Sequence, residues 1–217
     1  AIRPGNRSGE LRPLVASEGE TVLNVWLKIA PDNTVMAIVP HAEMGQGVHT
    51  TLAMMLAEEL EADWDMVSMM EAPANKAYAN YALVKGYAVG DVDFPAFLVD
   101  TIDGVFLSAT KYLSLQITGG STSVAFTGQY GMRVAGAAAK AMLLQAAADT
   151  WNVPISSLKA EKSHIIHSAS ARRAPFADFA VKAAQLSKPA IPVLITTDEF
   201  SILGTDVQKF DVPPKVD

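Results

Sequence analysis

The sequence predicts an α+β domain, and three observations lead to that prediction. Runs of the β-strand type stand near the N-terminus, at 22–30 and 34–40. Runs with helical spacing or helix-forming composition occupy 50–62, 94–115 and 133–151. These runs follow no regular β-α-β alternation and show no internal repeat, so we expect mixed hairpins and helices that pack together.

The strand-type runs come first along the chain. Val22 to Ala30 and Thr34 to Pro40 are joined by Pro31-Asp32-Asn33, which is typical of a hairpin turn. Pro40 has no N–H to donate to a ladder, so we expect the second strand to end there. A short strand is predicted from Met66 to Glu71, and strand and turn are predicted over 159–167.

The helical runs follow. In the run from Thr50 to Ala62 the apolar residues repeat at helical spacing: Leu52, Met55, Leu56 and Leu60. In the run from Phe94 to Leu115 the candidates for the buried face are Phe97, Ile102, Val105, Phe106 and Leu113. The third run, Arg133 to Trp151, is rich in alanine, and its Gly136 permits close packing. A last amphipathic helix is predicted from Pro175 to Leu186, with the proline at its start.

The remaining segments set the predicted domain boundaries. Residues 1–20 are polar and rich in Gly, Arg and Pro, and are expected to form an extended leader. The domain is expected over 21–187, with a long turn-rich loop at 72–93. Residues 188–217 are Pro-rich and are expected to form a linker towards a further domain.

Composition excludes several kinds of site. The chain has 217 residues, a net charge of −6 and no cysteine. The acidic balance argues against a nucleic-acid or anionic-membrane partner, and no apolar run approaches the roughly 18 residues of a membrane span. Without cysteine, the chain has no ligand for zinc-thiolate sites or for the usual iron–sulfur clusters. Any electron carriers must therefore lie elsewhere.

The most informative segment is a glycine turn between a strand and a helix. Gly45-Gln46-Gly47 follows the predicted strand that ends at Pro40 and opens into the helix that starts near Thr50. Such a turn exposes backbone N–H groups at the positive end of a helix dipole, which suits an anionic ligand such as a phosphate. Gln46 adds a side chain that both donates and accepts hydrogen bonds.

Simpler interpretations stand beside this one. A Gly-x-Gly turn also serves an ordinary strand-to-helix connection, and Ser121 and Ser123 also suit a turn or a helix N-cap. A dinucleotide site is disfavoured because the third glycine of that motif is missing. The four histidines form no defensible metal site. The acidic residues near the end of the first helix are expected to form a solvated face: Glu58, Glu59 and Glu61.

Three motifs, taken in order, resemble a known family. They are Glu43-Met44-Gly45-Gln46-Gly47, Gly119-Gly120-Ser121-Thr122-Ser123 and the helix from Arg133 to Lys140. In this order they resemble the molybdopterin-binding large subunit of the xanthine oxidase/aldehyde oxidoreductase family. Within that family the likeness is to isoquinoline 1-oxidoreductase β-subunits and membrane-associated aldehyde dehydrogenases, and it suggests an N-terminal fragment of such a subunit.

The resemblance implies a cofactor site with two walls. One wall would contain Gly45, Gln46, Gly47 and Thr50, and the other would contain Gly120, Ser121, Thr122 and Ser123. The implied cofactor is molybdopterin in its cytosine dinucleotide form. No cationic side chain is expected beside either loop, so backbone N–H groups and hydroxyls would meet the polyanion.

The resemblance also implies partners and a reaction. The family hydroxylates an N-heterocycle or an aldehyde with oxygen from water, and its iron–sulfur clusters lie on a small [2Fe-2S] subunit. No segment here matches the family's catalytic glutamate, so no catalytic residue or metal ligand is assigned, and the chain alone is expected to be inactive. The remainder of the large subunit would be a partner, and the location would be periplasmic or membrane-associated. The alternative is a non-catalytic structural or assembly domain without a cofactor.

Overall fold

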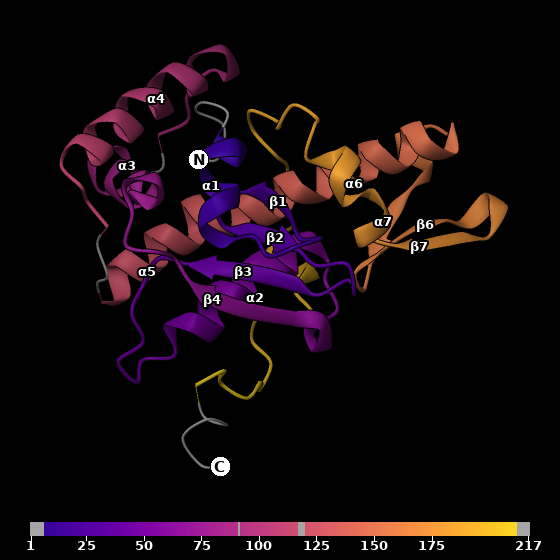
Figure 1. Cartoon of the computed structure of the whole chain (residues 1–217), viewed down its shortest axis with the longest axis horizontal. Helices are drawn as coiled ribbons and strands as arrows, with labels where there is room; N and C mark the ends of the chain where they lie inside the picture. Colours follow the sequence, from indigo (N-terminus) through magenta and orange to yellow (C-terminus); the bar gives the residue numbers. More distant parts are fainter. Residues whose placement is uncertain (1–6, 91, 117–119, 212–217) are drawn as a thin grey trace.

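The computed structural model describes residues 7–90, 92–116 and 120–211 (Figure 1). It confirms the predicted α+β class, with two sheets and several helices. The strands are β1 (Thr21–Asn24), β2 (Leu27–Ile29), β3 (Val35–Val39), β4 (Val67–Glu71), β5 (Lys159–Glu161), β6 (His164–His167) and β7 (Arg172–Pro175). The helices are α1 (Arg7–Val15), α2 (Val48–Leu60), α3 (Tyr81–Val89), α4 (Ala96–Tyr112), α5 (Ser121–Thr127), α6 (Val134–Trp151) and α7 (Ala177–Ala183).

The first sheet carries the predicted hairpin. Its order is β1-β2-β3-β4, with β3 and β4 parallel and the other neighbours antiparallel. The turn between β2 and β3 ends at Asn33, whose φ of 74° is tolerated by asparagine. The predicted strand over 22–30 is in fact two strands. The Asn24 side chain accepts a hydrogen bond from the Trp26 N–H at 3.0 Å, and this local bond turns the chain between them.

The N-terminal residues differ from the extended leader predicted for 1–20. Residues 7–15 form α1, in which Leu11 is fully buried and Val15 is 7% exposed. The Lys28 ammonium donates to the Val15 carbonyl at 2.7 Å and so ties the end of α1 to β2. Charged residues and Pro13 surround these two apolar side chains in the sequence and mask their helical spacing. The predicted domain boundaries at 21 and 188 stay a prediction.

The core lies between the first sheet and α6, with α2 packed against both. Leu52, Leu56 and Leu60 of α2 are fully buried, which confirms the predicted face. Gly136 of α6 meets α2 so closely that a Cβ atom there would collide with the Leu56 carbonyl oxygen. The close packing predicted for this glycine is therefore confirmed.

The predicted loop over 72–93 is largely helical. A 3-10 turn spans Lys76–Tyr78 and α3 spans Tyr81–Val89. Asn80 caps α3, since its side-chain oxygen accepts from the Leu83 N–H at 3.2 Å. Tyr78 and Tyr81 are fully buried, so this segment packs against the core. The polar residues that suggested a loop act here as helix caps.

Helix α4 confirms the helix predicted over 94–115 but not its buried face. Phe97 is 80% exposed and Val105 is 64% exposed, whereas Asp103 is fully buried. The Lys85 ammonium of α3 lies 2.6 Å from the Asp103 carboxylate. A polar pair thus joins the two helices, and apolar spacing alone selected the wrong side.

A long helical segment follows. The residues Gly128–Arg133 form a π-helical segment that joins α5 directly to α6. The second sheet has the order β5-β6-β7, and it confirms the strand and turn predicted over 159–167. Pro175 ends β7 instead of starting the last helix, α7. None of the helices in the described part of the chain is both long and apolar enough to cross a membrane.

Candidate functional site

The glycine turn lies where the sequence predicted it, between β3 and α2. Gly45 has a φ of 98° and Gly47 a φ of 77°, which are left-handed conformations that favour glycine. A Cβ atom on Gly45 would have no neighbour within 4 Å, so the outer side of the turn is open. The turn therefore needs its glycines for backbone conformation, and it leaves space beside Gly45.

The backbone N–H groups of this turn already have an acceptor. The Glu43 carboxylate accepts from the Gly45 N–H at 2.7 Å, the Gly47 N–H at 2.9 Å and the His49 N–H at 3.3 Å. Burial favours a higher pKa for Glu43, but these backbone hydrogen bonds outweigh it and lower the pKa. The prediction of several unpaired N–H groups awaiting an anion is therefore wrong for these amides.

Gln46 is exposed and uses its side chain within the turn. Its carbonyl oxygen accepts from the Met44 N–H at 2.5 Å, and its amide group donates to the Ala42 carbonyl at 2.9 Å. A cationic side chain also lies here, contrary to expectation. The Lys209 ammonium donates to the Gly45 carbonyl at 3.1 Å. Its position was not predictable from spacing, because 164 residues separate the two partners.

Thr50, which the resemblance places in the first wall, is a buried residue. It is 4% exposed in the first turn of α2, and its hydroxyl accepts from the Phe210 N–H at 3.0 Å. The Phe210 ring packs against Trp64 with ring centroids 5.3 Å apart. Thr50 thus lies behind the turn and contacts the C-terminal segment.

The second predicted segment begins a helix and is not a loop. Ser121 and Thr122 are exposed in the first turn of α5, whereas Ser123 is 6% exposed. Gly120 precedes them, and no side chain caps the helix there. A Cβ atom on Gly120 would have no neighbour within 4 Å. Gly119 lies outside the described residues.

A histidine joins the two segments. His41 precedes the turn, and its Nε2 lies 2.8 Å from the hydroxyl oxygen of Thr127 in α5. The Asn80 side chain donates to the same hydroxyl at 3.0 Å. His49 reaches back from α2, with its Nε2 3.0 Å from the His41 carbonyl oxygen. Neither His41 nor Thr127 was singled out from the sequence, although a histidine directly after a strand was a usable signal.

Burial decides the protonation of His41. The side chain is 2% exposed, and desolvation, followed by the charge of His49, lowers its pKa to about 4. The ring is therefore neutral at pH 7, and its contact with the Thr127 hydroxyl is a neutral hydrogen bond. This arrangement fixes the position of the turn relative to α5 and supplies no cation to a ligand.

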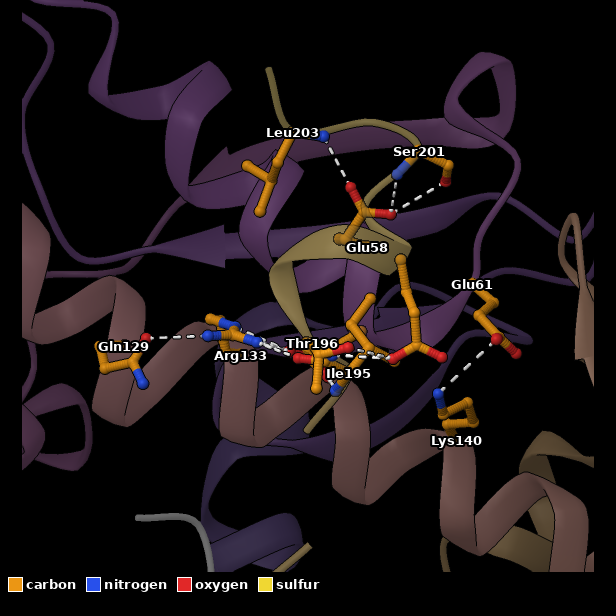
Figure 2. Close-up of polar contacts among 11 residues, drawn as sticks. Glu58, Glu61, Gln129, Arg133, Lys140, Ile195, Thr196, Ser201 and Leu203 are labelled. Atoms are coloured by element: carbon orange, nitrogen blue, oxygen red, sulfur yellow. Dashed lines mark hydrogen bonds and ion pairs between the residues drawn. The ribbon is translucent and has the colours of Figure 1, made fainter. Parts of the chain in front are cut away.

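Two of the acidic residues of α2 are buried, contrary to the solvated face predicted for them. Glu58 is 2% exposed and Glu59 is fully buried, while the Glu61 side chain is 41% exposed. Figure 2 shows Glu58 pointing towards Ser201 and Leu203. Among the described residues, no three His, Asp or Glu side chains gather as a metal site would require.

Part of the chain resembles known proteins. Residues 10–82 match the model of the molybdopterin cofactor-binding domain, a range that includes the glycine turn and ends before 120–123. The chain is 28% identical to isoquinoline 1-oxidoreductase subunit beta of Brevundimonas diminuta over 227 aligned residues, which cover 89% of this chain. It is 46% identical over 43 residues to the membrane-bound aldehyde dehydrogenase [pyrroloquinoline-quinone] of Gluconacetobacter polyoxogenes.

These alignments differ in extent. The first covers 25% of the Brevundimonas protein, and the second covers 20% of this chain and 6% of the Gluconacetobacter protein. The chain thus spans about a quarter of the length of the first relative. The matches confirm the predicted resemblance: residues 10–82 are similar to a molybdopterin cofactor-binding domain, and most of the chain is similar to part of isoquinoline 1-oxidoreductase subunit beta.

Proposed function

We propose that this chain contributes two walls of the molybdopterin site of a molybdenum hydroxylase. One observation carries the proposal: the 2.8 Å contact between His41 and Thr127 holds the glycine turn beside α5. The family match covers the turn, and the two segments of the resemblance thereby become parts of one region. The reaction would be the hydroxylation of an N-heterocycle or an aldehyde with oxygen from water.

The geometry suggests which wall meets which part of the cofactor. Gly45, Gln46 and Gly47 would line the pterin, because the space beside Gly45 is open while Glu43 occupies the turn amides. Residues 120–123 would meet the phosphates. There the helix start has no side-chain cap, and the residues offer backbone N–H groups and hydroxyls.

Thr50 would act from behind the first wall by holding Phe210. Gln46 would exchange its contacts within the turn for contacts with the cofactor, which its exposed position permits. The bound cofactor supplies the two-electron redox chemistry. The residues of this chain bind and orient the cofactor and exclude water around it, and the catalytic base would lie on a different part of the enzyme.

The wider assignment follows from the relatives. We propose that the cofactor takes the cytosine dinucleotide form and that the partners are the rest of a large subunit and a small [2Fe-2S] subunit. The word "subunit" in the name of the Brevundimonas relative supports a multi-chain enzyme. We also propose a periplasmic or membrane-associated location, of which the second is supported by the name of the Gluconacetobacter relative, a membrane-bound enzyme.

Gln46→Ala in the holoprotein tests the proposal. We expect it to lower the molybdenum content or the turnover with little loss of stability, because Gln46 is exposed and its two hydrogen bonds are local. Gln145→Ala is the matched control, since that glutamine is exposed on α6 and bonds to Asp149. Elemental analysis, turnover and urea unfolding are the measurements. Unchanged molybdenum content and turnover in Gln46→Ala would overturn the assignment.

One observation favours the alternative of a structural or assembly domain without a cofactor. Glu43 already satisfies the amides of the turn, so the turn is complete without a ligand. Analysis of the purified protein for molybdenum and organic phosphate separates the two functions. The cofactor site requires about one molybdenum and, for the dinucleotide form, about two organic phosphates per chain, whereas the structural domain requires neither.

A further inference from the structure

The end of the described chain lies along α2 and is held there by the two buried carboxylates. We call residues 195–210 the C-terminal strap. Both oxygens of Glu58 are used: one accepts from the Ser201 N–H at 2.8 Å and its hydroxyl at 2.9 Å. The other accepts from the N–H group of Ile202 at 2.7 Å and from that of Leu203 at 2.6 Å, the second of which is drawn in Figure 2. Four donors on one carboxylate offset the cost of burying its charge.

Glu59 holds the start of the strap in a second contact. One oxygen accepts from the Ile195 N–H at 3.0 Å, and the other lies 2.5 Å from a terminal guanidinium nitrogen of Arg133. The same guanidinium donates to the Ile195 carbonyl at 2.7 Å, as Figure 2 shows. Arg133 thus neutralises one of two adjacent buried carboxylates and binds the strap as well.

The strap runs antiparallel to α2 and ends at the glycine turn. Its first residues contact Glu59 near the end of the helix, and Phe210 contacts Thr50 near the beginning. Between Thr50 and Glu59 the helix rises by roughly 14 Å, at about 1.5 Å per residue. The Lys209 side chain passes over the turn, with its Cε 3.3 Å from where a Cβ of Gly47 would lie.

We propose that Glu58 is a positioning residue: by anchoring the strap, it holds Lys209 against the Gly45–Gly47 turn and Phe210 against Thr50 in the first turn of α2. The turn has two glycines without side chains, so its motion is limited by contacts from other residues. Glu43 supplies these contacts from within the turn, and the strap supplies them from the other side. The inference rests on the proposed function only in that this turn is the wall that we assign to the cofactor.

Amide hydrogen exchange in the purified, cofactor-free protein tests the inference. Glu58→Gln keeps the shape of the side chain but replaces one acceptor oxygen by an NH₂ group. That group cannot accept from the N–H donors of the strap and repels them. We expect exchange to rise at least about tenfold, equal to about 1.4 kcal/mol, in two places: the strap and the amides of residues 45–49. Glu61→Gln is the control, because Glu61 lies 3.9 Å from Lys140 and contacts no residue of the turn. It should leave the exchange of the turn unchanged.

The exchange rates of the strap and of the turn distinguish the possible outcomes. A rise in the strap without a rise in the turn overturns the inference, and so does no rise in either. Should Glu58→Gln fail to fold, Lys209→Met decides: faster exchange at residues 45–49 supports the inference, and unchanged exchange overturns it. The proposed function fails separately, through normal molybdenum loading of Gln46→Ala, and that result leaves the positioning role of Glu58 intact.

Discussion

The buried neutral His41 makes the stability of this protein depend on pH in a calculable way. Its pKa is lowered from 6.5 to about 4. In the unfolded chain the ring takes up a proton as the pH falls below 6.5, while in the folded chain it stays neutral down to about 4. The unfolded state then binds more protons, so stability is complete above pH 6.5 and declines as the pH falls towards 4.

The size of the effect follows from the shift. One pKa unit corresponds to about 1.4 kcal/mol, so the full loss below pH 4 is about 3 kcal/mol and the loss between pH 8 and pH 5 is about 2 kcal/mol. His41→Gln removes the titration while keeping a polar side chain near Thr127. The wild type should therefore lose about 2 kcal/mol more than this variant between pH 8 and pH 5.

Urea unfolding at pH 8 and pH 5 measures this difference. Thr127→Val is the second variant, because it removes the hydrogen-bond partner of His41 and leaves the ring buried. Burial is the main cause of the lowered pKa, so Thr127→Val should keep most of the pH dependence of the wild type. Equal losses in the wild type and His41→Gln would refute the reasoning.

Three further predictions concern other parts of the fold. Gly136→Ala should cost about 1–3 kcal/mol in urea unfolding because its Cβ collides with α2, whereas Gly104→Ala, with open space, should gain up to about 1 kcal/mol. Asp103→Leu should cost about 3 kcal/mol by leaving Lys85 without its carboxylate partner, and adding Lys85→Met should recover part of that loss. The stabilisation that comes with the lowered pKa of Glu43 should be complete above pH 4.5 and lost as the pH falls further, and Glu43→Gln should reduce this decline.

The elements with one apolar face were predictable from local sequence. Leu52, Leu56 and Leu60 are buried where their spacing places them, and the hairpin turn before Thr34 is confirmed. Such patterns work because a helix or strand that covers a core repeats its apolar residues at a fixed period. The glycine turn was located for a similar reason, since a strand, two glycines and a helix follow one another directly.

The rest depended on partners that are distant in sequence. Glu58 reads as a solvated residue because nothing nearby in the sequence neutralises it, and its hydrogen-bond donors lie 143 to 145 residues further on. The contact between Lys209 and the glycine turn was unpredictable for the same reason, since 164 residues separate Lys209 from Gly45. The buried face of α4 was predicted wrongly because a buried ion pair, between Asp103 and Lys85, takes the place of apolar contacts there. Local periodicity contains no information about such pairs.

The sequence distance between Glu58 and the strap has a consequence for biosynthesis. A ribosome makes the chain from the N-terminus, and Glu58 precedes Ser201 by 143 residues. Until the strap is added, the Glu58 carboxylate lacks the four donors that hold it in the complete chain, although the residues of the first sheet and of α2 have already been made. The turn can therefore gain its outer support only after the strap has left the ribosome.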